Sequence, residues 1–274
     1  MIALAKKRGK VIALVPTMGY LHKGHLSLAE QAKQTDAFVV MTIFVNPLQF
    51  GPNEDYARYP RDLERDAGMA ETAGVDVLFH PAAEEMYPRP MVTYVDVGQL
   101  DAVLCGTKRP GHFRGVATVV CKLFNIVQPD LAYFGQKDYQ QYLIIQRMAS
   151  DLNLPIEVCA APIVREEDGL ALSSRNVYLT SEQRREAKVL SQSLNEAEKR
   201  IRAGERSARE IERQIRDRIS SECRHGVIDY VEVRDAGDLS DVIIMEHPVL
   251  IALAVKFGST RLIDNKVVEV DPHV

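Results

Sequence analysis

Short apolar runs alternate with helix-like segments along the first two thirds of the chain. The runs are rich in β-branched residues and are bounded by turn residues, which is typical of buried strands; they lie at 11–15, 37–45, 75–79, 131–134 and 156–160. Between them, apolar residues recur at helical spacing in 25–34, 61–73, 116–127 and 139–151. Apolar strands that alternate with helices predict a parallel sheet covered on both faces, which is an α/β fold.

The pattern changes after about Asn176. Long, charged helices are predicted over 181–202 and 207–223, with Ser181 as the N-cap of the first, and strands over 228–233, 249–257 and 261–270. With right-handed crossovers, the first part becomes a Rossmann-like doubly wound parallel sheet. We therefore expect a Rossmann-like domain of residues 1–176 and a smaller C-terminal α+β domain of residues 177–274.

Composition and charge exclude several classes of protein. Hydrophobic residues make up 46% of the 274 residues and charged residues 26%, as in ordinary globular proteins. The 34 basic and 38 acidic residues give a net charge of −4, which argues against a nucleic-acid partner held by its backbone. The longest strongly apolar run, 38–45, is far shorter than the roughly 20 residues that span a bilayer, so no membrane partner is expected. Four widely spaced cysteines without a CxxC pair favour the reduced cytoplasm.

The strongest local signal lies between the first predicted strand and the first predicted helix. Residues 16–25 read PTMGYLHKGH, with His22 and His25 three positions apart and Gly24 between them. In an open α/β sheet, the ligand crevice lies beyond the carboxyl ends of the strands, and a helix N-terminus there favours phosphate. Two imidazoles at this place can donate hydrogen bonds to phosphate oxygens and stabilise charge that develops on them.

Two other interpretations of this stretch remain open. The histidines can be incidental to a turn, or they can bind a metal ion, although no third His, Cys or carboxylate ligand accompanies them. The arrangement resembles the HxGH signature of the nucleotidylyltransferase and class I aminoacyl-tRNA synthetase superfamily. That resemblance implies that His22 and His25 face the phosphates of ATP.

Further motifs narrow the resemblance. Polar stretches follow predicted strands or open predicted helices at 44–51 (FVNPLQFG), 59–61 (YPR), 111–116 (GHFRGV), 135–141 (GQKDYQQ), 172–176 (LSSRN) and 260–265 (TRLIDN). Together with residues 16–25, and in this order, they closely resemble the pantoate–β-alanine ligase family over nearly the whole chain.

The resemblance implies a two-step ligation. The carboxylate of (R)-pantoate attacks the α-phosphate of ATP and releases pyrophosphate; the amine of β-alanine then attacks the pantoyl adenylate and releases AMP, giving pantothenate. It also implies ATP as a substrate, Mg²⁺ bound mainly through the phosphates, and a cytoplasmic homodimer. The first domain is then the nucleotide-binding catalytic domain.

Site residues follow from the same resemblance, position by position. The catalytic residues are His25, as the proton donor, with His22, Lys137 and Arg175. The ATP site consists of Met18, Gly19, Tyr20, Leu21, His22, Lys23, Gly24, His25, Gly135, Gln136, Lys137, Asp138, Val164, Leu172, Ser173, Ser174 and Arg175. Gln49 and Gln141 bind pantoate, with Gln49 also near β-alanine, and Asn46 and Tyr59 are second contacts. We expect His22, His25, Lys137 and Arg175 to converge on one triphosphate.

Several points stay open at this level. His112 and Arg114 form either a flap over the site or the cap of the following helix. Asp62 and Asp66 either reach Mg²⁺ or, as we favour, make surface pairs on a helix. Members of the family usually carry a further strand and helix before the first strand, and residues 1–10 are expected to be the end of that helix.

Two other functions compete with a ligase. Another HxGH-type nucleotidylyltransferase would transfer a nucleotidyl group and stop there. A non-catalytic nucleotide-binding module would bind ATP and tolerate the loss of Lys137 or Arg175.

Overall fold

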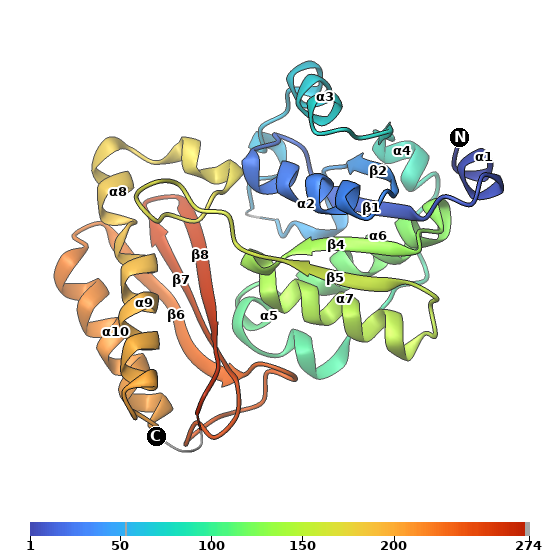
Figure 1. Ribbon diagram of the computed structural model, residues 1–274. Coiled ribbons are helices and arrows are strands. Elements are labelled where there is room, and N and C mark those ends of the chain that lie inside the picture. The colour runs from blue at the N-terminus through green and yellow to red at the C-terminus, as the bar shows by residue number, and fades with distance from the viewer. Residues whose placement is uncertain (53, 272–274) are drawn as a thin grey trace. The chain divides into compact units, whose positions relative to one another are not determined.

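The computed structural model describes residues 1–52 and 54–271 (Figure 1). The chain divides into two compact units, Met1–Val164 and Arg165–Val274. The sequence pattern predicts a domain boundary after residue 176, whereas the chain divides 12 residues earlier, after Val164. The segment 165–176 therefore belongs to the second unit.

The first unit is built on a five-stranded parallel sheet. Its strands are β1 (Ile12–Thr17), β2 (Phe38–Ile43), β3 (Val77–Phe79), β4 (Leu131–Gly135) and β5 (Glu157–Ala161), in the order β3-β2-β1-β4-β5. The β-branched residues of β1 and β2 are almost completely buried, as strands covered on both faces must be. The prediction of a doubly wound parallel sheet is confirmed.

Helices follow the strands and pair with one another. The chain contains α2 (Lys23–Gln34), α3 (Leu63–Thr72), α6 (His112–Val127) and α7 (Tyr139–Asp151), and the shorter α1 (Ile2–Lys7), α4 (Ala83–Met86) and α5 (Leu104–Lys108). Short 3₁₀ helices lie between them: η1 (Pro47–Gln49), η2 (Tyr56–Arg58), η3 (Gly98–Asp101) and η4 (Gln136–Asp138). Helix α2 contacts α3, and α6 contacts α7, as expected for helices on the two faces of the sheet (Figure 1).

The strand order indicates where a ligand crevice is expected in this sheet. The chain moves outward from β1 to β3 and then returns to β4, beside β1, which makes the β1/β4 pair the topological switch point. Leu14 pairs with Ala132, and three residues further along each strand the chain reaches Thr17 and Gly135. The residues that follow these two strand ends therefore lie at the same edge of the sheet.

The second unit is a three-stranded antiparallel sheet covered by helices. Its strands are β6 (Gly226–Asp235), β7 (Val249–Phe257) and β8 (Thr260–Val268), and its helices are α8 (Ser181–Glu186), α9 (Val189–Arg202) and α10 (Ala208–Glu222), preceded by the 3₁₀ helix η5 (Ser174–Tyr178). Helix α10 contacts β6 and α9 contacts β8, and both helices cover one face of this sheet (Figure 1). The predicted α+β arrangement is confirmed.

Two details of the second unit differ from the sequence prediction. The single helix expected over 181–202 is interrupted between Glu186 and Val189. Its N-cap is Thr180, not Ser181: the Thr180 hydroxyl accepts the backbone N–H of Gln183, and the Gln183 side chain accepts the backbone N–H of Thr180. This reciprocal pair satisfies two backbone donors at once, which a cap at Ser181 lacks.

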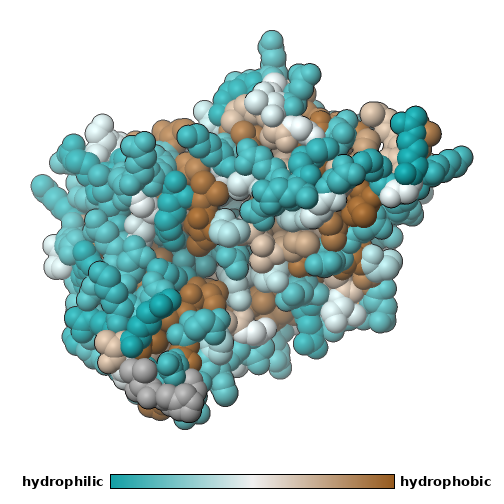
Figure 2. Space-filling view, in the orientation of Figure 1, coloured by the Kyte–Doolittle hydropathy of each residue, from teal (hydrophilic) through white to brown (hydrophobic). Residues whose placement is uncertain are grey.

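The surface drawn in Figure 2 is mostly hydrophilic, and its hydrophobic residues form smaller groups between charged ones. In the part of the chain that the structure describes, none of the helices combines the length and the apolar character needed to cross a membrane.

Candidate active site

The loop between β1 and α2 begins with a tight turn. The hydroxyl of Thr17 donates to the carbonyl of Thr42, at 2.6 Å, and accepts the backbone N–H of Gly19, at 3.2 Å. Gly19 has φ +86°, and a Cβ atom there would lie 2.8 Å from Cγ2 of Ile43. Glycine is therefore required, because a side chain meets both backbone strain and a buried neighbour.

A buried carboxylate holds the rest of this loop. Asp66 on α3 is 1% exposed, and its two oxygens accept the backbone N–H groups of Tyr20, at 2.6 Å, and Leu21, at 2.7 Å. Tyr20 has φ +50°, a left-handed conformation that persists because these bonds and the Arg65 guanidinium over its ring hold it. Our surface interpretation of Asp66 is thus wrong, whereas Asp62 is exposed and accepts the backbone N–H of Arg65 at the start of α3.

The two histidines form the N-terminus of α2. His22 is the N-cap, and its Nδ1 accepts the backbone N–H of Gly24, at 3.2 Å, while Nδ1 of His25 accepts the backbone N–H of His22, at 3.3 Å. The two rings stack with their centroids 3.9 Å apart. Because Nδ1 accepts in both rings, the neutral form of each carries its proton on Nε2 and is a hydrogen-bond donor there.

Charge at the histidines depends on their surroundings. Burial, followed by the charges of His22 and Lys137, lowers the pKa of His25 well below its usual value. His25 is therefore neutral at pH 7 in the unliganded protein. Lys137, in the segment after β4, is the last of these causes.

The stretch after β4 supplies that lysine. Gly135 ends the strand, and residues 136–138 form η4 directly before α7. Nζ of Lys137 lies 3.8 Å from the carboxylate of Asp138, which makes a loose ion pair. Gln136, like Lys137, is half-buried.

A second polar group follows β2, in η1. Asn46, the N-cap of η1, is 1% exposed, and its Nδ2 donates to Oε1 of Gln49, at 3.1 Å, and to the carbonyl of Gly115, at 3.1 Å. Nε2 of Gln49 lies 3.2 Å from Sδ of Met18 in the β1–α2 loop. The Gln49 amide and the proposed phosphate site are therefore adjacent.

Glycine at position 115 allows α6 to approach η1. A Cβ atom on Gly115 would lie 2.2 Å from the carbonyl oxygen of Leu48 and 2.8 Å from Cα of Gln49. Any side chain here would push the helix away from η1 and break the hydrogen bond from Asn46.

The start of α6 anchors the same segment. Nδ1 of His112 donates to the carbonyl of Gln49, at 2.8 Å, and Nε2 accepts from Arg109, at 2.9 Å; Arg109 also pairs with Glu54, at 2.6 Å. Burial, followed by the charge of Arg109, lowers the pKa of His112 to about 4. His112 is thus a neutral anchor for the segment that carries Gln49, and Arg114 instead packs over the ring of Tyr94, at 4.0 Å.

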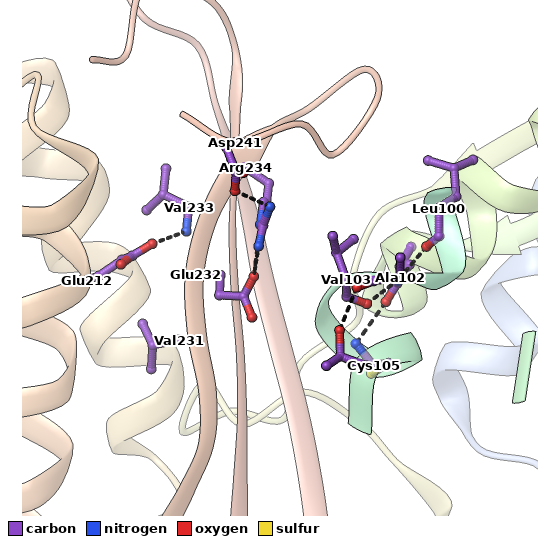
Figure 3. Close-up of polar contacts among 12 residues, drawn as sticks. Leu100, Ala102, Val103, Cys105, Glu212, Val231, Glu232, Val233, Arg234 and Asp241 are labelled. Atoms are coloured by element: carbon purple, nitrogen blue, oxygen red, sulfur yellow. Dashed lines mark hydrogen bonds and ion pairs between the residues drawn. The ribbon is translucent and has the colours of Figure 1, made fainter. Parts of the chain in front are cut away.

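Gln141 and its neighbour Gln140 lie in the first turn of α7. Gln140 is buried and holds the segment 100–105: it donates to the carbonyls of Leu100 and Val103, both at 2.8 Å, and accepts from the backbone N–H of Cys105, at 3.0 Å. Figure 3 labels Leu100, Val103 and Cys105 in this segment. Successive helical residues point about 100° apart. Gln141 therefore points in a different direction from Gln140, and it is half-buried.

Two further predicted residues occupy the first unit. Tyr59 is 5% exposed and packs edge-on against the ring of Phe50, with the centroids 6.1 Å apart. Val164 is half-buried and follows β5 as the last residue of the unit.

The stretch 172–176 belongs to the second unit. The Ser173 hydroxyl caps η5 by accepting the backbone N–H of Arg175, at 3.2 Å, and Ser174 is buried. Nδ2 of Asn176 donates to the carboxylate of Glu166 and to the carbonyl of Ala171, both at 3.1 Å. The turn that presents Arg175 is thus held by its own hydrogen bonds.

Sequence reasoning missed three residues that organise the first unit: Glu54, Tyr87 and Arg109. They lie outside the quoted motifs, and their partners are tens of residues away along the chain. Of these residues, only Arg109 and Glu54 gave a weak signal in the sequence, as residues of opposite charge in polar loops.

Within residues 1–52 and 54–271, no group of three or more His, Cys, Asp or Glu side chains is arranged to hold a metal ion. Asp66, the carboxylate that holds the β1–α2 loop, uses both of its oxygens on backbone N–H groups.

Comparisons with known proteins show which family the chain is similar to. Residues 1–267 match the family model described as pantoate-beta-alanine ligase. The chain is 67% identical over 262 residues to a pantothenate synthetase of Desulfitobacterium hafniense, covering 96% of this chain and 93% of that protein. It is 60% identical over 269 residues to a pantothenate synthetase of Acetivibrio thermocellus, covering 98% and 95%.

Solved structures show the same likeness. The crystal structure of pantothenate synthetase from Thermus thermophilus matches with a TM-score of 0.91 and 48% identity over 97% of both chains. A pantoate-beta-alanine ligase from Francisella tularensis, complexed with beta-gamma ATP and beta-alanine, matches with a TM-score of 0.78 and 32% identity over 99% of this chain and 95% of that one. By sequence and by structure, this chain belongs to the pantoate–beta-alanine ligase family.

Proposed function

We propose that the protein condenses (R)-pantoate with β-alanine to pantothenate, using ATP and passing through a pantoyl adenylate. The observation that carries this proposal is that His22 and His25 form the N-terminus of α2 after a loop whose Met18 contacts the Gln49 amide, at the switch point of the sheet. Donors for phosphate and a polar group for a hydroxylated acid are both needed for this reaction.

In the first step, a carboxylate oxygen of pantoate attacks the α-phosphorus of ATP, and the bond to the pyrophosphate oxygen breaks. Negative charge grows on the phosphate oxygens, where Nε2–H of His25, Nε2–H of His22 and the ammonium of Lys137 stabilise it. Binding of the polyphosphate raises the lowered pKa of His25, which allows this residue to donate a proton.

In the second step, the amine of β-alanine attacks the acyl carbon of the adenylate. The new amide bond forms as the acyl–phosphate bond breaks, and AMP leaves. Both steps require mainly alignment and stabilisation of charge, so positioning residues matter as much as reacting ones.

The ATP site comprises the β1–α2 loop, residues 135–138, Val164 and residues 172–175. We assign Ser173, Ser174 and Arg175 to the β- and γ-phosphates and the leaving pyrophosphate, and the backbone of Val164 to adenine. Gln49 and Gln141 hold pantoate. Asn46 and Tyr59, whose side chains are buried in contacts with Gln49 and Phe50, are second contacts for pantoate and β-alanine.

The same proposal includes Mg²⁺, which would reach the site bound to the phosphates of ATP and would neutralise part of their charge. It also includes a homodimer in the cytoplasm. The family membership and the composition support these assignments.

The proposed function is tested by incubating the protein with ATP, Mg²⁺, pantoate and β-alanine, omitting each component in turn. A ligase releases AMP only when both the acid and the amine are present, whereas the acid alone already releases pyrophosphate as the adenylate forms. Retention of the nucleotide on the product would instead indicate a nucleotidylyltransferase, and nucleotide binding without turnover would indicate a regulatory module.

A further inference from the structure

We propose that Tyr87 and Asn46 are positioning residues that turn the amide of Gln49, so that its NH₂ group and not its carbonyl oxygen faces the acid substrate. This inference rests on the proposed function, because it assumes that Gln49 contacts pantoate. To that function it adds a source of specificity. A relay of side-chain hydrogen bonds presents a donor group, and therefore favours a substrate with an acceptor at that place.

The orientation of Asn46 is forced by two backbone groups. Its Oδ1 accepts the backbone N–H of Leu48, at 3.3 Å, and its Nδ2 donates to the carbonyl of Gly115, at 3.1 Å. A backbone N–H can only donate and a carbonyl can only accept, so the reverse orientation of the amide would lose both bonds. At 1% exposure, the Asn46 side chain is shielded from bulk solvent, so losing these bonds would be costly.

The orientation of Gln49 follows from that of Asn46. The second hydrogen on Nδ2 of Asn46 points to Oε1 of Gln49, at 3.1 Å. Nε2 of Gln49 is therefore on the opposite side, 3.2 Å from Sδ of Met18. A thioether is a weak acceptor, so a carboxylate or hydroxyl oxygen of a bound acid makes a stronger bond to this NH₂ group.

Tyr87 completes the relay from the other side. Its hydroxyl donates to Oδ1 of Asn46 at 2.7 Å, the shortest hydrogen bond that this amide makes. The ring lies 6.0 Å from that of Phe44 and under the ammonium of Lys122, at 5.6 Å from its centroid. Burial raises the pKa of the Tyr87 phenol, so the donor proton is retained throughout the physiological range.

The experiment replaces Tyr87 by phenylalanine, which removes the hydroxyl and keeps the ring. Tyr94→Phe is the matched control, because the Tyr94 hydroxyl donates to the carbonyl of Met91 on an exposed segment. We expect kcat/KM for pantoate to fall by roughly fivefold to tenfold in Tyr87→Phe, the scale of one lost hydrogen bond, while the KM for ATP stays unchanged. Tyr94→Phe should leave both values unchanged.

Two further experiments test the relay: a double-mutant cycle, and a variant that should turn the Gln49 amide the other way round. In an Asn46→Ala background, Tyr87→Phe should have no further effect on pantoate, because its partner is gone. In Asn46→Asp, the carboxylate attracts the NH₂ group of Gln49 and turns the carbonyl toward the substrate, so kcat/KM for pantoate should fall at least about tenfold.

An equal effect of Tyr87→Phe with and without Asn46 would overturn the inference, as would a parallel rise of the KM for ATP and for pantoate. Unchanged pantoate kinetics in Tyr87→Phe, in an enzyme whose parent makes pantothenate, would sink this inference alone. A parent protein that releases no AMP from the complete mixture would instead sink the proposed function.

Discussion

Asp66 accepts the backbone N–H of Leu21 at 2.7 Å, although 45 residues separate the two along the chain. This bond, with its twin to Tyr20, fixes the turn that delivers His22 to the N-terminus of α2. The geometry of the proposed phosphate site thus depends on a buried carboxylate that uses both of its oxygens on backbone N–H groups.

Asp66→Asn should destabilise the protein and weaken ATP binding. The amide keeps the shape but turns an NH₂ group toward a backbone N–H, so one buried donor loses its acceptor, at a cost of about 1–3 kcal/mol. Denaturant unfolding and the KM for ATP measure the two effects. Asp62→Asn is the control, because asparagine caps a helix about as well as aspartate. Equal stability of both variants would refute the role of Asp66.

Lys137→Ala should lower turnover by at least about 100-fold, the scale for loss of one preorganised charge contact to a transition state. The ion pair of Lys137 with Asp138, at 3.8 Å, is too long to contribute much to stability, and the circular dichroism spectrum and melting temperature check that the variant folds. Lys108→Ala, on the exposed end of α5, is the control for loss of a positive charge. Turnover equal to that of the parent would show that Lys137 does not meet the phosphates.

His25→Ala should slow formation of the adenylate more than the attack of the amine, because charge builds on the pyrophosphate oxygens in the first step. Pre-steady-state measurement of pyrophosphate release and of AMP release separates the two steps, and equal slowing would contradict the assignment. In the parent protein, the lowered pKa of His25 should appear as an NMR titration midpoint below 6.5 that rises when ATP is added.

Local pattern and topology were enough to predict much of the fold. The apolar run of β1, the helical spacing of α7 and the alternation of strands and helices led to the doubly wound sheet because each is a local consequence of burial. The helix break at residues 187–188 was missed because a charged, regular pattern continues across it. There, the capping box at Thr180 and tertiary packing decide the helix ends.

The site was only partly predictable for a similar reason. The loop of His22 and His25 and the stretch of Lys137 lie next to strand ends, so sequence position indicates their place. Tyr87, Arg109 and Asp66 act through hydrogen bonds between residues that are 41 to 60 positions apart. A single sequence contains no periodicity that links such partners.

His112 should make the stability of the protein dependent on pH. Its folded-state pKa of about 4 lies below the unfolded value near 6.5, so the unfolded chain binds the proton more tightly between these two values. The stabilisation is complete above pH 6.5 and is lost as the pH falls toward 4.

From pH 7 to pH 4.5, this one group should account for a loss of about 2 kcal/mol in the free energy of unfolding. Urea unfolding of the parent and of His112→Asn at both pH values isolates the effect, because contributions from other groups such as His25 are common to both proteins and cancel in the difference. The variant should lose less stability than the parent by that amount. Were the two proteins to lose stability in parallel, the neutral anchor between Arg109 and the Gln49 carbonyl would have to be abandoned, since protonation of Nε2 would then cost nothing.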